Sequence, residues 1–350
     1  MDGGHALTEV SLSEVRDFAA LGARWRGLEE KSDLSFFQSW TWIGCLPEER
    51  FPDPILAEAR DAGEIVGLAL FNRRRSVVRD RLFLSETGIP NLDRLAVEYN
   101  GPVVASGRSD VRDAILRTAA SGYDLVLSGM TDSFSGLSAQ TRLAPFARTD
   151  AGWFSRRSAN TRQQIRRSDR ACAAFGSLVA SCAEDETTPH DWLDTMAGMH
   201  RATWNARGKP GSFADPFFGR FHHELIRRGM PRGETDLWRV TAGERTIGIL
   251  YNFRYRGHVL AYQSGFAYDP ATPRLKPGLT CHRIAIEACA RDGMAVYNFL
   301  AGDDRYKRSL ADGHDTMHWE IAGPWWSPRL LALRMRARAA HVRDALGGGT

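Results

Sequence analysis

The chain has 350 residues, of which 43% are hydrophobic and 25% are charged, and its formal net charge is +4. This length is sufficient for two domains with cores of ordinary size. No apolar run approaches the ~20 residues that a membrane-spanning helix needs, so we expect no membrane span.

Residues 1–10 lack a basic region followed by an apolar one, so we expect no signal peptide. The five cysteines are scattered and form no C-x-x-C pair: Cys45, Cys172, Cys182, Cys281 and Cys289. Their odd number and their spacing argue against a disulfide framework and against a zinc site. We therefore expect no metal site and a cytoplasmic location.

The first half of the chain mixes helices and strands. Apolar residues at helical spacing predict a helix over residues 11–31, and an aromatic helix is predicted over 39–46, ended by Pro47. The turn Asp61-Ala62-Gly63 predicts a β-hairpin. Further strands are predicted at 81–85, 103–105 and 123–128, and a helix at 110–120. We expect one α/β or α+β lobe in residues 1–152.

A second lobe is predicted in residues 153–350. Its helices are expected at 160–175, 190–207, 215–228 and 278–291, with a basic C-terminal helix at 328–346. Its strands are expected at 236–241, 246–253, 258–266, 296–300 and 314–321. The helix at 160–175 carries Arg162, Arg166, Arg167 and Arg170 on one face, which either holds phosphate groups or is simply solvated.

One internal repeat links the two lobes. Residues 65–73 align with residues 246–254, and each segment follows a glycine-containing turn after an earlier strand. The pair predicts a duplicated unit of roughly 150 residues, because the periods of solenoid repeats are much shorter.

Polar side chains follow the short apolar segment 296–300. Gly302, Asp303, Asp304, Tyr306 and Lys307 come directly after it. A buried strand gives rigid support, and the residues that follow it carry titratable side chains. This combination favours a reaction site. The alternative is a helix N-terminus with Asp303 or Asp304 as its cap.

A second candidate site lies at the start of the helix predicted for 278–291. Free N–H groups and the helix dipole make an anion site there, to which Lys276 adds charge. We therefore predict that Lys276, Gly278, Leu279 and Thr280 bind the phosphates of a donor. The alternative is an ordinary Pro-Gly helix start.

Several blocks of the second lobe resemble a known family. They are His200, Trp204 and Gly208, the run Gly211-Ser212-Phe213-Ala214-Asp215-Pro216, Phe221, Gly265-Phe266, and Phe299-Leu300-x-Gly302-Asp303-x-x-Tyr306-Lys307. In this order they resemble the BioF2-like or CelD-like branch of the GNAT acyltransferases. That branch is related to the Fem aminoacyltransferases, which carry two GNAT-like lobes. Two positions depart from the family pattern. Asn298 stands where the family often has an acid, and residues 275–280 match the GNAT pyrophosphate signature only in part.

The resemblance implies two GNAT-like lobes with mixed α/β sheets and an N-acyltransferase. The acyl group would pass from acyl-CoA or acyl carrier protein to an amine of a small metabolite, sugar or lipid precursor. Two alternatives remain: a Fem-like transferase that uses aminoacyl-tRNA, with basic faces at 162–170 and 329–343 on the RNA, and a non-catalytic partner that keeps the GNAT shell. Each donor would be a co-substrate rather than a tightly bound cofactor, and no DNA partner is expected.

Acyl transfer to an amine needs a proton acceptor, a group that holds the oxyanion, and exclusion of water. We predict Asp303 as the base or amine-positioning group, Lys307 as the oxyanion or phosphate stabiliser, and Tyr306 as a proton donor to the leaving group. His200 is the next candidate base, or a structural histidine.

The predicted acceptor-binding residues, which are equally suited to a core, are Trp204, Phe213, Asp215, Tyr251 and Tyr262.

Overall fold

The structure is a computed structural model that describes residues 8–135, 138–269, 272, 274–324, 326–328, 330–332 and 335. The chain forms two compact units: unit 1 comprises Met1–Thr141 and Met317–Thr350, and unit 2 comprises Arg142–Thr316. The predicted domain limits, 1–152 and 153–350, differ from these units because they assign residues 142–152 to the first lobe and residues 317–350 to the second.

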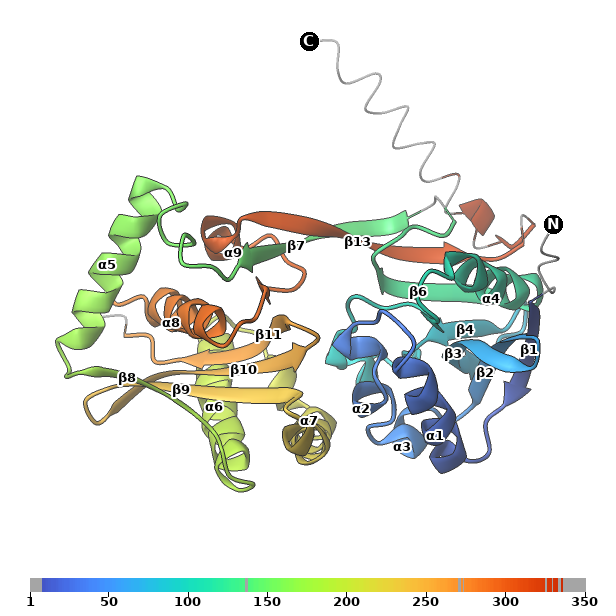
Figure 1. The fold of residues 1–350 in the computed structure, drawn as a ribbon, viewed down its shortest axis with the longest axis horizontal. Coiled ribbons are helices and arrows are strands. Elements are labelled where there is room, and N and C mark those ends of the chain that lie inside the picture. Colours follow the sequence, from blue (N-terminus) through green and yellow to red (C-terminus); the bar gives the residue numbers. More distant parts are fainter. Residues whose placement is uncertain are drawn as a thin grey trace, which may run out of the picture. The chain divides into compact units, whose positions relative to one another are not determined.

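Unit 1 is built on a mixed sheet in the order β1-β2-β3-β4-β6-β13, and β5 pairs with β3. Its strands are β1 (Glu9–Glu14), β2 (Pro54–Asp61), β3 (Glu64–Arg74), β4 (Arg81–Leu84), β5 (Val103–Val104), β6 (Asp124–Met130) and the second half of β13 (Gly313–Ala322). Its helices are α1 (Phe18–Glu29), α2 (Trp40–Ile43), α3 (Pro47–Arg50) and α4 (Ser109–Gly122), with 3₁₀ turns at Phe36–Gln38 and Leu92–Leu95. Figure 1 shows α4 packed beside this sheet.

The predicted hairpin is confirmed in unit 1. The aromatic helix is present but spans only Trp40–Ile43, and Pro47 begins α3 instead of ending α2. The first helix is also shorter than predicted. Residues 9–14 form strand β1, and α1 begins only at Phe18, where the Asp17 side chain accepts from the backbone N–H of Ala20. An aspartate that caps this N–H fixes the start of the helix. Residues 11–14 therefore pair with β2 instead of extending the helix.

Unit 2 has a sheet in the order β7-β12-β11-β10-β9-β8. Its strands are β8 (Leu178–Cys182), β9 (Thr235–Ala242), β10 (Arg245–Tyr255), β11 (His258–Phe266), β12 (Val296–Asn298) and the second half of β7 (Ser138–Arg148). Its helices are α5 (Ala159–Ala173), α6 (Thr188–Asn205), α7 (Pro216–Gly229), α8 (Pro277–Arg291) and α9 (Arg305–Leu310), with 3₁₀ turns at Ser212–Ala214 and Met230–Arg232. The sequence analysis predicted neither β7 nor β8.

Helices cover both faces of the sheet in unit 2. In Figure 1, α8 lies above strands β9 to β11, and α6 and α7 lie below them. Two glycines allow this close approach. A Cβ atom at Gly248 would lie 2.7 Å from Cys281 Sγ of α8, and one at Gly265 would lie 2.7 Å from the Met196 carbonyl oxygen of α6. The sheet is thus enclosed between α8 on one face and α6 on the other.

The two units repeat one topology. In unit 1, β1 to β4 pair antiparallel in succession, β4 pairs parallel with β6, and β6 pairs antiparallel with β13. In unit 2, β8 to β11, β12 and β7 show the same five pairings in the same order. The predicted repeat is confirmed, since residues 65–73 lie in β3 and residues 246–254 in the equivalent β10. The last strand of each unit is exchanged: β7 follows β6 in the chain but pairs with β12.

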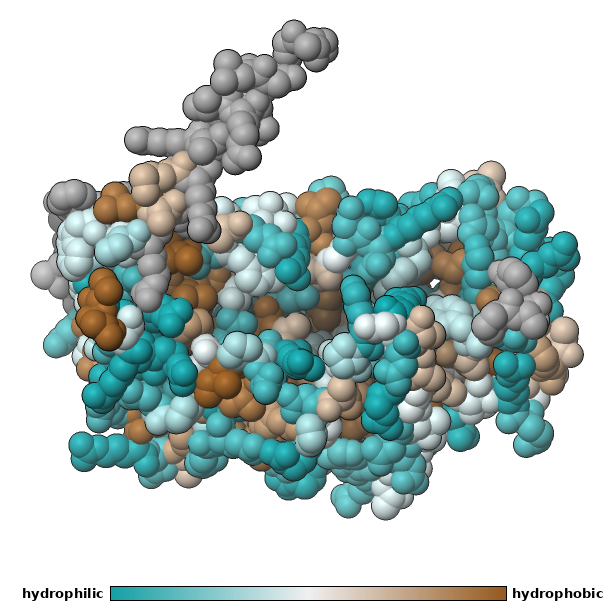
Figure 2. All heavy atoms as spheres, turned by 180° about the vertical axis from the view of Figure 1, so that it is seen from behind, coloured by the Kyte–Doolittle hydropathy of each residue, from teal (hydrophilic) through white to brown (hydrophobic). Residues whose placement is uncertain are grey.

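Each unit has its own apolar core. In unit 1 it gathers β2, β3, β4, β6 and α4 around residues such as Phe71, Ile115 and Leu125. In unit 2 it gathers β10, β11, β12, α5 and α8 around residues such as Ile165 and Tyr297. The surface seen in Figure 2 is mostly hydrophilic, with apolar residues scattered over it. Among the described residues, no helix is long and apolar enough to cross a membrane. The predicted C-terminal helix at 328–346 falls mostly outside the described residues.

A carboxyl group with a raised pKa lies in unit 1. Glu86 follows β4, and its Oε2 accepts a hydrogen bond from Ser128 Oγ of β6 at 2.6 Å. Burial raises the pKa of Glu86 from 4.5 to about 7, since removing the carboxylate from water disfavours its charged form. In the unfolded chain the same group releases its proton at about pH 4.5.

This difference predicts a stability that falls with pH. Because the folded-state pKa is the higher one, the contribution of Glu86 is fully present below pH 4.5 and is lost as the pH rises through about 7. Glu86→Gln keeps an acceptor for Ser128 without a charge. We expect it to raise the free energy of unfolding by about 1–2 kcal/mol at alkaline pH and to leave it nearly unchanged in acid.

Urea unfolding of the parent and Glu86→Gln across the pH range measures this difference. Glu64→Gln, on the exposed turn between β2 and β3, is the matched control. A difference between parent and Glu86→Gln that does not change with pH would show that this carboxyl group titrates normally in the folded protein.

Candidate active site

The centre of unit 2 is a pair of parallel strands that separate. β11 and β12 pair only at His258–Val296, Val259–Tyr297 and Leu260–Asn298. After that, β11 continues to Phe266 beside β10, whereas the chain after Asn298 follows β7. The N–H groups of Phe299 and Gly302 donate to the carbonyl oxygens of Pro145 (2.9 Å) and Leu143 (3.0 Å). Within the described residues, no strand pairs with the second half of β11 on its β12 side.

A β-bulge lies in β11 at this point. Tyr251 of β10 opposes Gln263 and Asn252 opposes Ala261, so Tyr262 is the extra residue. A bulge bends a strand and re-aims its side chain, and bulges are common beside active sites. The Tyr262 ring lies 5.1 Å from that of His222 on α7, between ring centroids. Tyr262 therefore belongs to the α7 side of the sheet.

The chain after β12 turns sharply and is held by side chains. Asn298 Oδ1 accepts from the backbone N–H of Leu300 at 2.8 Å, and Leu300 has a φ of +59°. Lys307 of α9 is buried, and its Nζ donates to the carbonyl oxygens of Leu300 (3.1 Å) and Ala301 (3.0 Å). The ammonium group thus satisfies two carbonyls that would otherwise remain without strand partners.

The other predicted catalytic residues of this segment lie closer to solvent. Asp303 forms an ion pair with Arg308 and is exposed. Helix α9 begins at Arg305 with Asp304 at its N-cap position, as the alternative for this segment predicted, but the Asp304 side chain makes no capping hydrogen bond. Tyr306 is 38% exposed, and its ring stacks on His282 of α8 at 5.5 Å between centroids. Desolvation raises the pKa of the Tyr306 phenol, which is therefore protonated at neutral pH.

His282 is a site residue that the sequence analysis did not identify. It is buried, and its Nδ1 lies 3.0 Å from the Tyr297 hydroxyl oxygen. The rings of Phe266 and Phe299 meet it edge to face. Burial, followed by the charge of Lys307, lowers the pKa of His282 to about 3, so the imidazole is neutral. The one signal in the sequence was a histidine inside an apolar helix.

The predicted anion site lies at the start of α8. Pro277 is its first residue, and Lys276 precedes it with Nζ 3.1 Å from Gln164 Oε1 of α5. The Ser168 hydroxyl donates to the Lys276 carbonyl oxygen at 2.7 Å and lies 2.8 Å from Thr280 Oγ1. Leu279 and Thr280 are buried, so only Lys276 and Gly278 lie near the surface at this helix end.

A second cluster of predicted residues lies on the α6 and α7 side of the sheet. The buried His200 ring lies 5.7 Å from Trp204 and 5.3 Å from Phe213, between ring centroids. Burial, followed by the charge of Arg201, lowers the pKa of His200 to about 4. Its imidazole is therefore neutral at pH 7 and is a weak base.

Two predicted acceptor-binding residues have structural contacts. The Asp215 side chain accepts from the backbone N–H of Phe217 at 2.9 Å and caps α7. Tyr251 is fully buried, with its hydroxyl oxygen 3.4 Å from His222 Nδ1. For Trp204, Phe213 and Tyr262 the acceptor-binding role stays a prediction.

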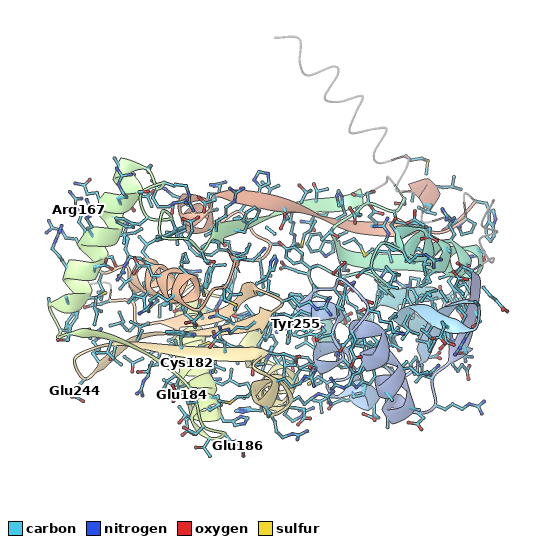
Figure 3. All side chains as sticks on the ribbon, in the orientation of Figure 1. Arg167, Cys182, Glu184, Glu186, Glu244 and Tyr255 are labelled. Atoms are coloured by element: carbon cyan, nitrogen blue, oxygen red, sulfur yellow. The ribbon has the colours of Figure 1, made fainter. Side chains whose placement is uncertain are left out.

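A large groove lies elsewhere in unit 2. It has a volume of about 1370 Å³ and is lined by the loop after β8, the end of α7, the start of β9, and the end of β10 with the turn that follows it. Figure 3 labels Cys182, Glu184, Glu186 and Tyr255 among its lining residues. None of the predicted site residues lines it. In the part of the chain that the structure describes, no three His, Cys, Asp or Glu side chains are arranged to hold a metal ion.

A substitution at Gly302 tests how firmly the two carbonyl oxygens hold the Lys307 ammonium group. Gly302 has a φ of +144°, and a Cβ atom there would lie 2.9 Å from Lys307 Nζ. We expect Gly302→Ala to lower the free energy of unfolding by about 2–4 kcal/mol, because it adds backbone strain and displaces the ammonium from its carbonyls.

Gly293→Ala is the matched control, since Gly293 has a φ of +72° but no neighbour within 4 Å of an added Cβ. It should cost only the strain, about 1–2 kcal/mol. Equal losses in the two variants, measured by urea unfolding, would show that Lys307 moves aside without cost.

Comparisons with known proteins show which family and which folds this chain is similar to. Residues 159–308 match the family described as "Acetyltransferase (GNAT) domain". No curated protein matches the sequence. The crystal structure of FemX is similar with a TM-score of 0.56 at 9% identity, over 88% of this chain and 95% of that one.

Two further solved structures share the fold. The C-terminal domain of a putative lysylphosphatidylglycerol synthetase from Agrobacterium fabrum has a TM-score of 0.54 at 10% identity, over 91% of this chain and 95% of that one. L-PGS from Bacillus licheniformis has a TM-score of 0.53 at 8% identity, over 90% and 96%. At such identities the likeness concerns the fold. Residues 159–308 are thus similar to a GNAT acetyltransferase domain, and over most of its length the chain is similar in fold to FemX.

Proposed function

We propose that the protein is an N-acyltransferase that moves an acyl group from acyl-CoA or acyl carrier protein to an amine of a small metabolite, sugar or lipid precursor. The observation that carries the proposal is the separation of β11 from β12 within the matched GNAT domain. In the described part of the chain, β11 pairs with β12 only as far as Leu260, and we propose that an extended donor arm lies along β11 beyond that point. Such an arm could add to the sheet edge through backbone hydrogen bonds.

The donor's phosphates are proposed to lie at the start of α8. The backbone N–H groups around Gly278 and the helix dipole favour an anion there, and the exposed Lys276 adds a positive charge. Thr280 supports this position indirectly, because its hydroxyl group bonds to Ser168 and connects α8 with α5. Leu279 contributes only its backbone, since its side chain is buried.

The proposed chemistry uses the segment after β12. The amine nitrogen attacks the thioester carbonyl carbon, the C–S bond breaks, and the leaving thiolate takes a proton. The Tyr306 phenol is protonated and can supply that proton. Asp303 would position the amine or accept its proton, and the Lys307 charge would stabilise the oxyanion. His200 is a weaker candidate base, because its pKa of about 4 gives it little affinity for a proton at neutral pH.

A second candidate is a Fem-like transferase that takes an aminoacyl group from tRNA and forms an amide or peptide bond. Two observations favour it: the likeness in fold to FemX, and three exposed arginines on α5, Arg166, Arg167 and Arg170. Guanidinium groups spaced along a helix can follow a phosphate backbone. The other predicted basic face, at 329–343, lies largely outside the described residues.

Transfer assays separate these candidates. The purified protein is incubated with a panel of amines and with radiolabelled acetyl-CoA, acyl carrier protein or aminoacyl-tRNA in turn. We expect an amide product from the first or second donor. A product formed only with aminoacyl-tRNA would replace the proposal with the second candidate. No product with any donor, together with no donor binding by calorimetry, would leave only a non-catalytic role.

Lys307→Met tests the proposed oxyanion contact. We expect kcat to fall by about 10²–10³ because the transition state loses a charged partner. Lys31→Met, at an exposed position of unit 1, is the control. Melting temperatures must accompany the rates, because Lys307 also holds two carbonyls. A folded Lys307→Met protein with turnover within about threefold of the parent would remove this residue from the mechanism.

Asp303→Asn tests the proposed amine contact against a structural role. Arg308→Gln is the matched control, since it breaks the same ion pair and leaves the carboxylate in place. We expect Asp303→Asn to lower kcat by about tenfold or more and Arg308→Gln to change it little. Equal effects of the two variants on rate would mean that only the ion pair matters.

A further inference from the structure

The loop between β3 and β4 exposes two adjacent apolar side chains. Val77 is 106% exposed and Val78 is 71% exposed, more than any other large hydrophobic residue that the structure describes. Single exposed apolar residues are common on protein surfaces. Two adjacent valines at the tip of a hairpin, both almost fully in water, are unusual because nothing in the described chain offsets their hydration.

The loop itself is well anchored. The Ser76 N–H donates to Asp80 Oδ1 at 2.9 Å, and the Asp124 N–H donates to the Asp80 carbonyl oxygen at 3.1 Å. Arg79 donates to the Ser121 carbonyl oxygen at 3.0 Å and lies 3.4 Å from Asp124 Oδ1. The exposure of Val77 and Val78 is therefore a property of a fixed loop rather than of an unsupported one.

A half-exposed tryptophan contacts the same loop through Arg79. The guanidinium carbon of Arg79 lies 4.9 Å from the ring centroid of Trp326, which is 50% exposed. This contact brings Trp326 to the base of the loop within unit 1. We call Val77, Val78 and Trp326 the hairpin patch. The two valines make the tip of the patch apolar. Its base is amphipathic, because the indole of Trp326 can contact both apolar groups and water.

Arginines surround the hairpin patch. Residues 73–81 contain five arginines and a single acid, Asp80. Arg73 is bound to Asp53 and Glu14, and Arg79 to Asp124. The Arg75 side chain is 77% exposed and lies 3.6 Å from Asp53, so its charge is largely presented to solvent. An apolar tip with cationic flanks fits a layered partner that is apolar inside and anionic at its surface.

We propose that the hairpin patch docks on the surface of an anionic lipid bilayer. Val77 and Val78 would enter the boundary between headgroups and acyl chains, Trp326 would lie at headgroup level, and Arg75 would face lipid phosphates. Apolar burial together with attraction to anionic headgroups is the usual basis of peripheral binding. An RNA or an acidic protein would use the arginines but would gain little from two valines at a hairpin tip. This inference does not depend on the proposed reaction.

Co-sedimentation of the full-length protein with vesicles tests the docking. One set contains phosphatidylcholine with phosphatidylglycerol, and the other contains phosphatidylcholine alone. We expect binding to the anionic set that weakens at high salt, and much weaker binding to the neutral set. Val77→Ser with Val78→Ser should weaken binding to the anionic vesicles about tenfold, with an unchanged melting temperature.

Matched variants separate this patch from general surface effects. Val179→Ser changes another exposed valine, on edge strand β8 of unit 2, and should leave vesicle binding unchanged. Arg75→Gln should weaken it about fivefold, whereas Arg167→Gln, on the exposed face of α5, should not.

Three results would overturn the proposal. The first is no binding of the parent to anionic vesicles. The second is vesicle binding that the double serine variant retains in full. The third is binding of single-stranded RNA or a polyglutamate peptide by the parent, weakened by Arg75→Gln, without any binding to vesicles. This result would assign the arginines to a soluble polyanion.

Discussion

The structure of unit 2 depends on how the backbone is satisfied where β12 ends. A strand that continued beside β11 would bond its N–H and C=O groups in the ladder, and buried groups without such partners are costly. Here the chain leaves β11, and its backbone groups bond elsewhere. The N–H group of Leu300 donates to the Asn298 side chain, and those of Phe299 and Gly302 donate to β7. The carbonyl oxygens of Leu300 and Ala301 accept from Lys307. The edge of β11 is left open because these substitutes exist.

The same arrangement holds the Lys307 side chain in a fixed position. Its ammonium group is buried, and a buried charge needs hydrogen-bonding partners. Two carbonyl oxygens partly meet that need and fix the ammonium where the chain turns after β12. A structural role and a role in the reaction are compatible, since a charge that is fixed before the reaction costs no reorganisation during it. His282 remains neutral, first because its burial disfavours the charged form and second because Lys307 would repel another positive charge.

Much of this fold could be read from the sequence, because its strongest signals are local. The two hairpins, helices α6 to α8 and the segment 296–307 follow from turn residues and apolar spacing. β7 was missed because it contains Pro145 and a polar first half, which weaken a strand signal. The exchange of β7 and β13 between units depends on pairing across long stretches of chain, which no local pattern records. In the candidate site, the Lys307 contacts and His282 were missed because they depend on tertiary packing, which local spacing does not record.

The duplication repeats this strand separation in unit 1. There the parallel strands β4 and β6 likewise pair at only three positions. There the opening is closed by a side chain: Asn100 Nδ2 donates to the carbonyl oxygens of both Leu84 and Ser128, at 3.1 Å each. An amide that bonds both strand ends occupies the place that a ligand would need. The two units thus share one strand separation, and in unit 1 the Asn100 amide bridges it.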